Sequence, residues 1–171
     1  MISRTGQRNL PAMPTIRPYE ENDLSALVDL VRELQAEEAR LYDRMKPAAA
    51  MGTWYVDLLR KRCAEEDGTV LVAEENGKLV GYATVLTSII EDGTGDEVRY
   101  AYAYVGDLVT ARASRRRGVG KLLLEECERR ARVAGRDELR ITVLAENHRA
   151  HGVYRAFGFH DLLIDMRKKL S

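Results

Sequence analysis

The chain has 171 residues, enough for one domain that buries a sizeable core. Its 27 basic and 27 acidic residues give a formal net charge of zero, so no overall positive field favours binding to nucleic acid or to a membrane surface. Two cysteines lie far apart in sequence, which argues against a disulfide framework and indicates a reducing compartment.

The start of the chain has the composition of an extension that precedes the folded domain. Residues 1–14 lack the apolar core of a signal peptide, and no later run reaches the length of a membrane span. Because this leader contains several Arg, Gly and Pro residues and precedes the first strand-like run, we expect a flexible extension over residues 1–14. One domain should follow over residues 15–171, and we expect the protein to be cytoplasmic.

The domain should begin with a short strand and two helices. Thr15 to Arg17 predicts the strand. Asn22 or Asp23 can cap a helix whose apolar residues recur at helical spacing, and it should run to about Leu41. A second helix is expected in the segment from Pro47 to Glu65.

Three strands should come next. Thr69 to Glu74 and Lys78 to Ile90 are joined by Asn76-Gly77, a strong hairpin signal. Arg99 to Val109 then alternates tyrosines with smaller residues, so the tyrosines share one face until a bulge intervenes. That face, formed by Tyr100, Tyr102 and Tyr104, is either half-buried strand surface or an aromatic wall for a substrate.

The most informative stretch runs from Val105 to Leu124, where an apolar strand leads into Arg-Arg-Arg-Gly-Val-Gly-Lys and then a helical pattern. A glycine-containing turn at a helix start gathers unpaired main-chain N–H groups beside the positive end of the helix dipole. Such a turn can hold a diphosphate. Basic side chains add positive charge there, although a run of this kind can also be a solvated surface cluster.

The spacing of the glycines excludes two other phosphate-binding loops. A nucleoside triphosphate loop needs Ser or Thr after its lysine, but Leu122 follows Lys121. A dinucleotide-binding turn needs a third glycine, and none follows Gly118 and Gly120 at the required distance.

The last part of the chain predicts a helix, a strand, a helix and a strand. Their expected ranges are Gly118 to Ala134, Ile141 to Val143, Asn147 to Ala156 and Leu162 to Met166. Strand–helix–strand units after a run of hairpin strands make a mixed sheet covered by helices, so we expect an α/β fold of the α+β kind.

Two blocks in this order resemble the GNAT superfamily of N-acetyltransferases. The first is Arg115-x2-Gly118-x-Gly120 after a strand that ends Asp-Leu-x-x, similar to the acetyl-CoA loop of that family. The second is Asn147-x2-Ala150-x3-Tyr154-x2-Phe157-Gly158-Phe159. The resemblance covers roughly residues 15–170. It implies a mixed, mostly antiparallel sheet with splayed central strands, flanked by about four helices.

The resemblance also implies how acetyl-CoA is held. The main chain of Leu108, Val109 and Thr110 would bind the pantetheine arm where the central strands part. The loop and helix start would bind the diphosphate, and its residues are Arg115, Arg116, Arg117, Gly118, Val119, Gly120 and Lys121. Asn147 would contact the CoA arm, although an N-cap role is an equal alternative. Thr110 and Arg112 depart from the aliphatic residue and proline usual there, which puts side-chain packing rather than cofactor binding in doubt.

Tyr154 is the candidate for the chemistry. Attack of an amine on a thioester expels a thiolate, and a phenol with a pKa near ~10 can donate a proton to sulfur while staying protonated at pH 7. Members of the family with Tyr at this position resemble that arrangement. The alternative is an ordinary helix tyrosine that packs beneath Phe157.

A base must take a proton from the attacking amine, whose pKa is near ~10. Asp107 lies where the strands should part, and we name it as a candidate beside Tyr154, although an aspartate at a bulge often bonds the local backbone instead. Four carboxylates in the loop before the tyrosine strand either attract a cationic acceptor or form a solvated hairpin tip. These are Glu91, Asp92, Asp96 and Glu97.

The histidines do not predict a metal site. His148 and His151 lie three apart on a helix, but a zinc ion normally needs a third and a fourth ligand, and neither cysteine is spaced to supply one. We therefore expect no metal.

Taken together, these features predict an N-acetyltransferase that moves the acetyl group from acetyl-CoA to a primary amine by direct attack in a ternary complex. The acceptor is a small molecule or a protein amine. The alternative is a non-catalytic module that binds or senses acyl-CoA. The resemblance also implies a homodimer, because relatives often pair through exposed strands or the C-terminal segment.

Overall fold

A computed structural model describes residues 13–93 and 95–170 of the chain. The expected extension over residues 1–14 therefore lies almost entirely outside the described residues. Within them, no helix is long and apolar enough to cross a membrane.

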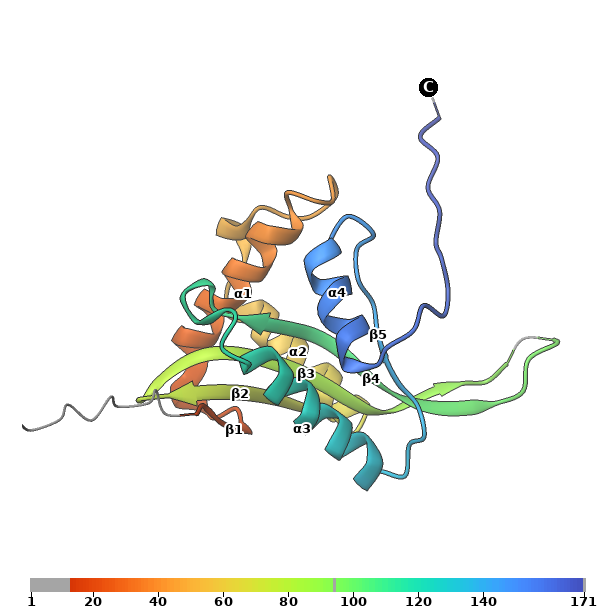
Figure 1. The fold of residues 1–171 in the computed structure, drawn as a ribbon, viewed down its shortest axis with the longest axis horizontal. Helices are drawn as coiled ribbons and strands as arrows, with labels where there is room; N and C mark the ends of the chain where they lie inside the picture. The colour runs from red at the N-terminus through yellow and green to blue at the C-terminus, as the bar shows by residue number, and fades with distance from the viewer. Residues whose placement is uncertain (1–12, 94, 171) are drawn as a thin grey trace, which may run out of the picture.

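The described part of the chain folds into a five-stranded mixed sheet with helices on both faces (Figure 1). The strands lie in the sheet in chain order: β1 (Thr15–Pro18), β2 (Thr69–Glu75), β3 (Lys78–Glu91), β4 (Tyr100–Thr110) and β5 (Leu139–Ile141). Neighbours are antiparallel except β4 and β5, which are parallel. This confirms the mixed, mostly antiparallel architecture predicted from the sequence.

Local sequence explains the hairpin between β2 and β3. Asn76 and Gly77 have φ values of 52° and 74°. Two successive positive φ values are typical of the turn whose twist matches the flanking strands, and Asn-Gly is the pair that adopts it most readily. The predicted hairpin is confirmed.

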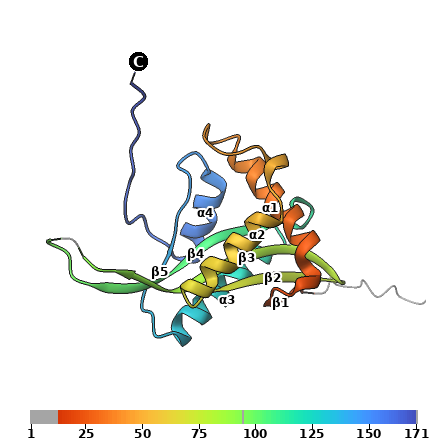
Figure 2. The same cartoon turned by 180° about the vertical axis from the view of Figure 1, so that it is seen from behind.

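Among the residues that the structure describes, four α-helices cover the sheet, two on each face. The helices α1 (Leu24–Glu38) and α2 (Thr53–Glu65) lie on the face that Figure 2 shows in front. The helices α3 (Val119–Val133) and α4 (His148–Phe157) lie on the opposite face. Each pair closes its own hydrophobic core, one around Leu27 and Tyr82, the other around Leu123 and Tyr154.

A β-bulge in β4 decides which side chains reach which core. Val105 pairs with Val85 and Leu108 pairs with Ala83, so two residues of β4, Gly106 and Asp107, face the single residue Thr84. The extra residue reverses the alternation, and Asp107 therefore points to the same face as Tyr104. This is the bulge expected at the end of the tyrosine run.

Two elements have boundaries that differ from the prediction. The helix α1 ends at Glu38 rather than near Leu41, because its apolar periodicity stops at Leu34 and residues 39–41 form turns. The strand β5 covers Leu139–Ile141 rather than Ile141 to Val143, since only those residues meet β4 before the two strands separate.

The expected strand from Leu162 to Met166 is absent. This segment has the alternation of a strand, but it has no neighbouring strand within the described residues. The main-chain hydrogen bonds of a sheet need a partner strand, so an alternating side-chain pattern is not sufficient to make this segment a strand.

Candidate functional site

The sheet opens between β4 and β5. Their pairing involves only Ala103 to Val105 against Leu139 to Ile141. From Gly106 onward, β4 has no partner on that side among residues 13–93 and 95–170. The splayed strands predicted for the centre of the fold are confirmed, and the opening exposes one edge of β4.

The main chain of β4 presents two N–H groups to this opening. The N–H of Asp107 donates to the Thr84 hydroxyl at 2.8 Å, and the N–H of Ala111 donates to the Val80 carbonyl at 2.9 Å, both on β3. Successive N–H groups of a strand point to opposite sides, so that of Val109 also faces β3. The main-chain N–H groups of Leu108 and Thr110 therefore face the opening between β4 and β5.

The start of α3 lies at the end of the same strand. A short turn after Arg115 contains two residues with left-handed backbone, Arg116 at φ 63° and Gly118 at φ 82°. No side chain caps the helix at Gly118. The first-turn N–H groups of Val119, Gly120 and Lys121 are therefore left for solvent or a ligand, at the positive end of the helix dipole.

Acidic neighbours already engage most of the basic side chains in this loop. Arg117 forms an ion pair with Glu75, Lys121 lies 2.8 Å from Glu125, and Arg115 lies 3.8 Å from Glu37. Among the described residues, Arg116 has no carboxylate within 4.0 Å. The anion-binding capacity of the loop therefore comes mainly from main-chain N–H groups and the helix dipole.

Tyr154 on α4 faces the second core, with a relative exposure of 9%. Its ring centre lies 6.0 Å from that of Phe159. No described buried polar side-chain atom lacks a hydrogen-bond partner, and the Tyr154 hydroxyl makes no such bond, so it touches solvent. Burial, together with the charges of Glu38 and Asp107, raises its pKa to about 12 and keeps the hydroxyl protonated at neutral pH.

Asp107 lies beneath α2 at the bulge. Its carboxylate accepts a hydrogen bond from the Tyr82 hydroxyl at 2.9 Å and from the Tyr55 hydroxyl at 3.2 Å. Burial raises the pKa of Asp107, while the two tyrosines and Arg62 oppose the rise. A cavity of about 110 Å³ lies beside it, lined also by Tyr104 and Cys63. The carboxylate therefore bonds side chains rather than the local backbone.

Glu38, the last residue of α1, is a further carboxylate near this site that the sequence analysis did not select. Burial and the charge of Asp107 raise its pKa. A signal was available, because Val31, Leu34 and Glu38 are spaced to share one face of the helix. A carboxylate on an apolar face and at the negative end of a helix dipole is unfavourable for folding, which is typical of a functional residue.

The carboxylates before β4 lie elsewhere. Glu91 is the last residue of β3, and Asp92, Asp96 and Glu97 lie in the connection to β4, which projects from the body of the fold (Figure 1). All four side chains are exposed. Glu91 accepts a hydrogen bond from the Tyr102 hydroxyl, and Asp92 pairs with Arg99. Their arrangement is that of a solvated hairpin rather than of an acceptor site.

The tyrosine face divides in two. Arg140 lies over the rings of Tyr100 and Tyr102, at 5.0 and 4.0 Å from the ring centres. The rings of Tyr100 and Tyr102 therefore pack under Arg140 as ordinary strand surface. Only Tyr104 lines the cavity beside Asp107, and its hydroxyl donates to Thr142 at 2.9 Å.

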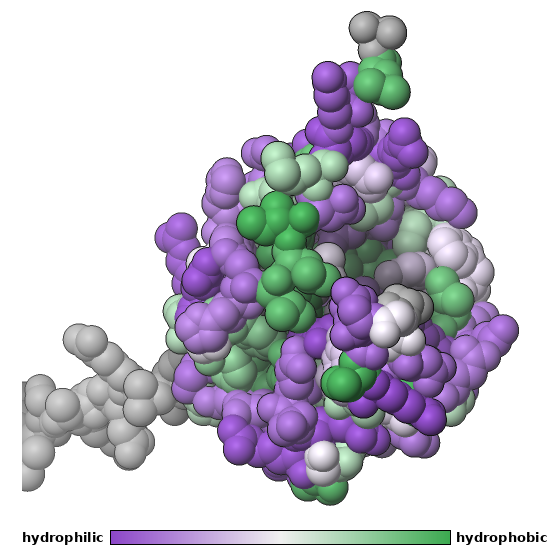
Figure 3. Space-filling view, turned by 90° about the vertical axis from the view of Figure 1, so that its right-hand side faces the viewer, coloured by the Kyte–Doolittle hydropathy of each residue, from purple (hydrophilic) through white to green (hydrophobic). Residues whose placement is uncertain are grey.

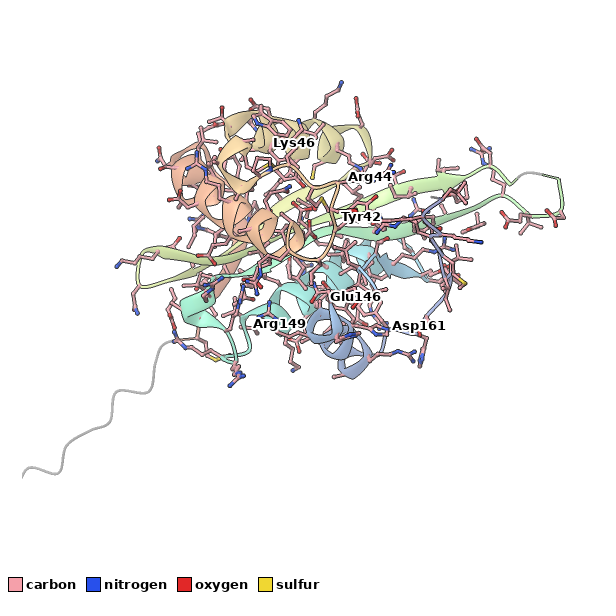
Figure 4. The ribbon with its side chains drawn as sticks, turned by 90° about the horizontal axis from the view of Figure 1, so that it is seen from above. Tyr42, Arg44, Lys46, Glu146, Arg149 and Asp161 are labelled. Atoms are coloured by element: carbon pink, nitrogen blue, oxygen red, sulfur yellow. The ribbon has the colours of Figure 1, made fainter. Side chains whose placement is uncertain are left out.

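The surface is hollowed on the side where α1 and α4 face each other. Figure 3 shows this hollow with apolar surface along one side. Seen from above, Tyr42, Arg44 and Lys46, which follow α1, lie opposite Glu146 and Arg149 near the start of α4 (Figure 4). Polar and charged residues of both signs therefore face each other across this side of the molecule (Figure 4).

Asn147 is the N-cap of α4. Its side-chain oxygen accepts a hydrogen bond from the N–H of Ala150 at 3.1 Å. A carbonyl oxygen can accept a second bond, and the amide nitrogen can still donate to a ligand, so the cap does not preclude a CoA contact. No group of three or more potential metal ligands occurs among the described residues.

Comparison with solved structures identifies the same fold in other proteins. A transcriptional regulator from Bacillus halodurans C-125 is 19% identical, with a TM-score of 0.69 over 92% of this chain and 99% of that one. An aminoglycoside 6′-N-acetyltransferase from Acinetobacter haemolyticus is 18% identical, with a TM-score of 0.63 over 92% and 99%. An aminoglycoside N-acetyltransferase in complex with CoA is also 18% identical, with a TM-score of 0.63 over 91% and 100%.

Comparison at the level of sequence identifies the family. A search of curated proteins found no match. The family model described as the acetyltransferase (GNAT) family matches residues 28–159, which contain the β4 opening, the loop before α3 and Tyr154. The chain therefore belongs to the GNAT family of acetyltransferases.

Proposed function

We propose that this chain is an N-acetyltransferase that transfers the acetyl group of acetyl-CoA to a primary amine by direct attack in a ternary complex. The observation that carries the proposal is the opening between β4 and β5, with free main-chain donors on one wall and the Tyr154 hydroxyl accessible to solvent nearby. We take residues 15–171 to form one acetyltransferase domain. Both cysteines are free, which agrees with a reducing, cytoplasmic location.

The donors support acetyl-CoA as the cosubstrate. The N–H groups of Leu108 and Thr110 would bind the amide groups of the pantetheine arm as an added strand does. The loop from Arg115 and the first turn of α3 would hold the diphosphate, which places the reacting thioester deeper in the opening. The N–H and C=O of one strand residue point to the same side, so both groups of Val109 face β3, and its side chain is buried in the first core. Of the three strand residues, Leu108 and Thr110 would therefore make the contacts.

Tyr154 would act as the proton donor. The amine nitrogen attacks the thioester carbonyl carbon, the carbon–sulfur bond breaks, and the electron pair leaves with sulfur. The phenolic hydrogen stabilises that sulfur and passes to it, giving the free thiol. The pKa of about 12 makes Tyr154 a protonated donor over the whole neutral range. The tyrosinate that forms recovers a proton from solvent.

Asp107 and Glu38 would take the proton from the amine. Each has a raised pKa and each lies close enough to Tyr154 for its charge to raise the pKa of that hydroxyl. A carboxylate with a raised pKa is a stronger base than an exposed one. Two such groups also attract a cationic acceptor, and we propose an alkylammonium substrate, in agreement with the aminoglycoside acetyltransferases among the similar structures.

The experiment that tests this proposal follows free thiol release from acetyl-CoA with a panel of amines. Amine-stimulated release that Tyr154→Phe abolishes, while acetyl-CoA still binds by calorimetry, would support the proposal. Tight acetyl-CoA binding without release for any amine would instead favour a non-catalytic acyl-CoA module.

A further inference from the structure

The cavity beside Asp107 has a positive charge on its wall that the proposed mechanism does not use. Arg62 on α2 lines this cavity, and its guanidinium lies over the ring of Tyr104, 5.7 Å from the ring centre. A contact between a cation and an aromatic face holds the guanidinium in place without using its N–H donors. The cavity therefore combines a positioned positive charge from α2 with the Asp107 carboxylate from β4.

Arg62 differs from the other two basic residues of α2. Arg60 pairs with Glu21 at 2.7 Å, and Lys61 lies 3.8 Å from Glu65. Among residues 13–93 and 95–170, no carboxylate lies within 4.0 Å of the Arg62 side chain. A guanidinium presents several N–H donors in a plane that matches a carboxylate, so Arg62 can bind an anion that enters the cavity.

The spacing along α2 decides where this charge lies. Tyr55, Leu59 and Arg62 are four and three residues apart, so all three project from one face of the helix. The Tyr55 hydroxyl donates to the Asp107 carboxylate at 3.2 Å. Arg62 lies about two turns further along the helix, or about 10 Å along its axis. The cavity therefore has an anionic part near Tyr55 and a cationic part near Arg62.

The two charges act on each other without forming an ion pair. Burial raises the pKa of Asp107, and the charge of Arg62 opposes that rise, so the two groups lie within electrostatic reach. The described residues leave the Arg62 guanidinium without a carboxylate partner, Asp107 included. A small molecule that carries both an ammonium and a carboxylate would satisfy both charges at once.

We propose that the amine acceptor of this chain is a small amino acid, whose carboxylate binds Arg62 while its amine faces Asp107 and the thioester. This inference rests on the proposed function and narrows its acceptor. The cavity volume of about 110 Å³ suits a small molecule, since sites for larger ligands usually enclose about 300–1,000 Å³. Apolar side chains that also line the cavity would contact the carbon skeleton, and these are Leu58, Leu59 and Leu86.

An acceptor that carries only positive charges explains the cavity less well. The guanidinium of Arg62 would repel the second ammonium of a polyamine or an amino sugar. A carboxylate on the acceptor turns this repulsion into attraction. The position of Arg62 therefore favours amino acids over purely cationic amines.

Matched acceptors test the inference. Release of free thiol from acetyl-CoA is followed with small amino acids from glycine to leucine, with β-alanine and γ-aminobutyrate, and with the carboxamide of each. The carboxamide keeps the amine and the carbon skeleton but lacks the negative charge. We expect kcat/KM for the preferred free acid to exceed that for its amide by about 10- to 100-fold. The amide has the less basic amine, so its larger fraction of free amine would by itself give the opposite preference.

Variants of α2 assign this preference to one side chain. Arg62→Met keeps the length of the side chain but removes its charge, so it should raise the KM for the preferred acid about 10- to 100-fold. Its kcat and its KM for the amide should change little, because Arg62 takes no part in the chemical step. Arg62→Lys should recover part of the affinity. Arg60→Met, on the same helix but outside the cavity, is the matched control and should leave both KM values unchanged.

The outcomes separate this inference from the proposed function. Equal rates with acids and amides, a preference for diamines or amino sugars, or an equal loss for acid and amide in Arg62→Met would overturn the inference. Each of these results would leave the acetyltransferase proposal intact. Absence of thiol release with every amine would overturn both. Circular dichroism of the variants should match that of the wild type, because the Arg62 side chain is exposed.

Discussion

The hydroxyl of Thr84 on β3 accepts a hydrogen bond from the main-chain N–H of Asp107 on β4, at 2.8 Å. The contact lies at the bulge where β4 changes the face to which its side chains point. It holds Asp107 toward Tyr55 and Tyr82 and helps to turn the N–H groups of its neighbours toward the opening. One hydroxyl therefore links the bulge to both the carboxylate and the proposed binding edge for acetyl-CoA.

Gly106→Ala should disturb this link. A Cβ at Gly106 would lie 2.6 Å from the Thr84 Oγ, which is far inside van der Waals contact. We expect a loss of about 1–3 kcal/mol in the free energy of unfolding, measured with urea, and a lower kcat. Adding Thr84→Ala should recover part of the stability, because it removes the clashing atom. Gly152→Ala, where a Cβ meets open space, is the control. Equal stability of Gly106→Ala and the wild type would argue against a tight bulge.

Gly120→Glu should abolish acetyl-CoA binding. The residue lies in the first turn of α3, and a carboxylate there would occupy the positive end of the helix and repel the diphosphate. Arg117→Ala should cost much less, since Arg117 is already paired with Glu75. Isothermal titration calorimetry measures both. Undiminished affinity in Gly120→Glu would remove this loop from the cofactor site.

Tyr154→Phe should lower kcat by about 10²-fold or more, the usual contribution of a positioned proton donor. The KM for acetyl-CoA should change little, because the proposed cofactor contacts are main-chain groups elsewhere. The wild-type rate should show no loss from deprotonation of this hydroxyl until the pH approaches about 12. Tyr100→Phe, on the part of β4 covered by Arg140, is the matched control. An unchanged kcat would assign the proton to another group.

Glu38→Gln and Asp107→Asn should separate the two candidate bases. A base must lose its proton before it acts, so kcat/KM should rise with pH through the raised pKa of that carboxyl. The variant that removes the base should lose this rising limb and most of its activity. The other variant should keep the limb, moved to lower pH, because one neighbouring negative charge has been removed. Retention of the limb in both variants would exclude both residues.

Asp107→Asn should also change how stability depends on pH. Burial raises the pKa of Asp107 in the folded state, so folding favours the protonated carboxyl. This contribution is fully present below the unfolded pKa of about 3.9 and is lost as the pH rises through the folded value. The stability of the variant relative to the wild type should therefore increase between acidic and neutral pH. A constant difference across urea titrations at several pH values would contradict this.

Arg17→Leu should destabilise the start of the fold. The Arg17 guanidinium donates to both oxygens of Asp23 at 2.7 and 2.8 Å and to Glu74 at 2.8 Å, and so ties β1 to β2 and to the start of α1. Removing it leaves the buried Asp23 without its cation, at a cost of about 3 kcal/mol in urea unfolding. Arg17 lowers the pKa of Asp23, so this stabilisation is present above the unfolded pKa and is lost as pH falls through the folded value. Arg129→Leu, which removes an exposed pair on α3, should cost far less.

Much of the fold and part of the site follow from residues that are close together in the sequence. Asn76-Gly77 alone sets the β2–β3 turn, and Asn147 alone caps α4. The glycines before α3 and the strand that precedes them predict the donor-rich helix start. Turns, caps and helix starts depend on a few neighbouring residues, so they can be predicted from the sequence alone.

The tertiary structure decided what depends on distant segments. Only packing of α1 against the sheet brings Glu38 near Asp107, and only the register with β3 turns Asp107 toward Tyr55. The length of β5 depends on where β4 stops pairing with it. Residues 162–166 have the pattern of a strand but no neighbour among the described residues. The side-chain pattern indicates which face of a strand is apolar. A strand also needs a neighbouring strand for its main-chain hydrogen bonds, and the sequence by itself does not say which segment supplies it.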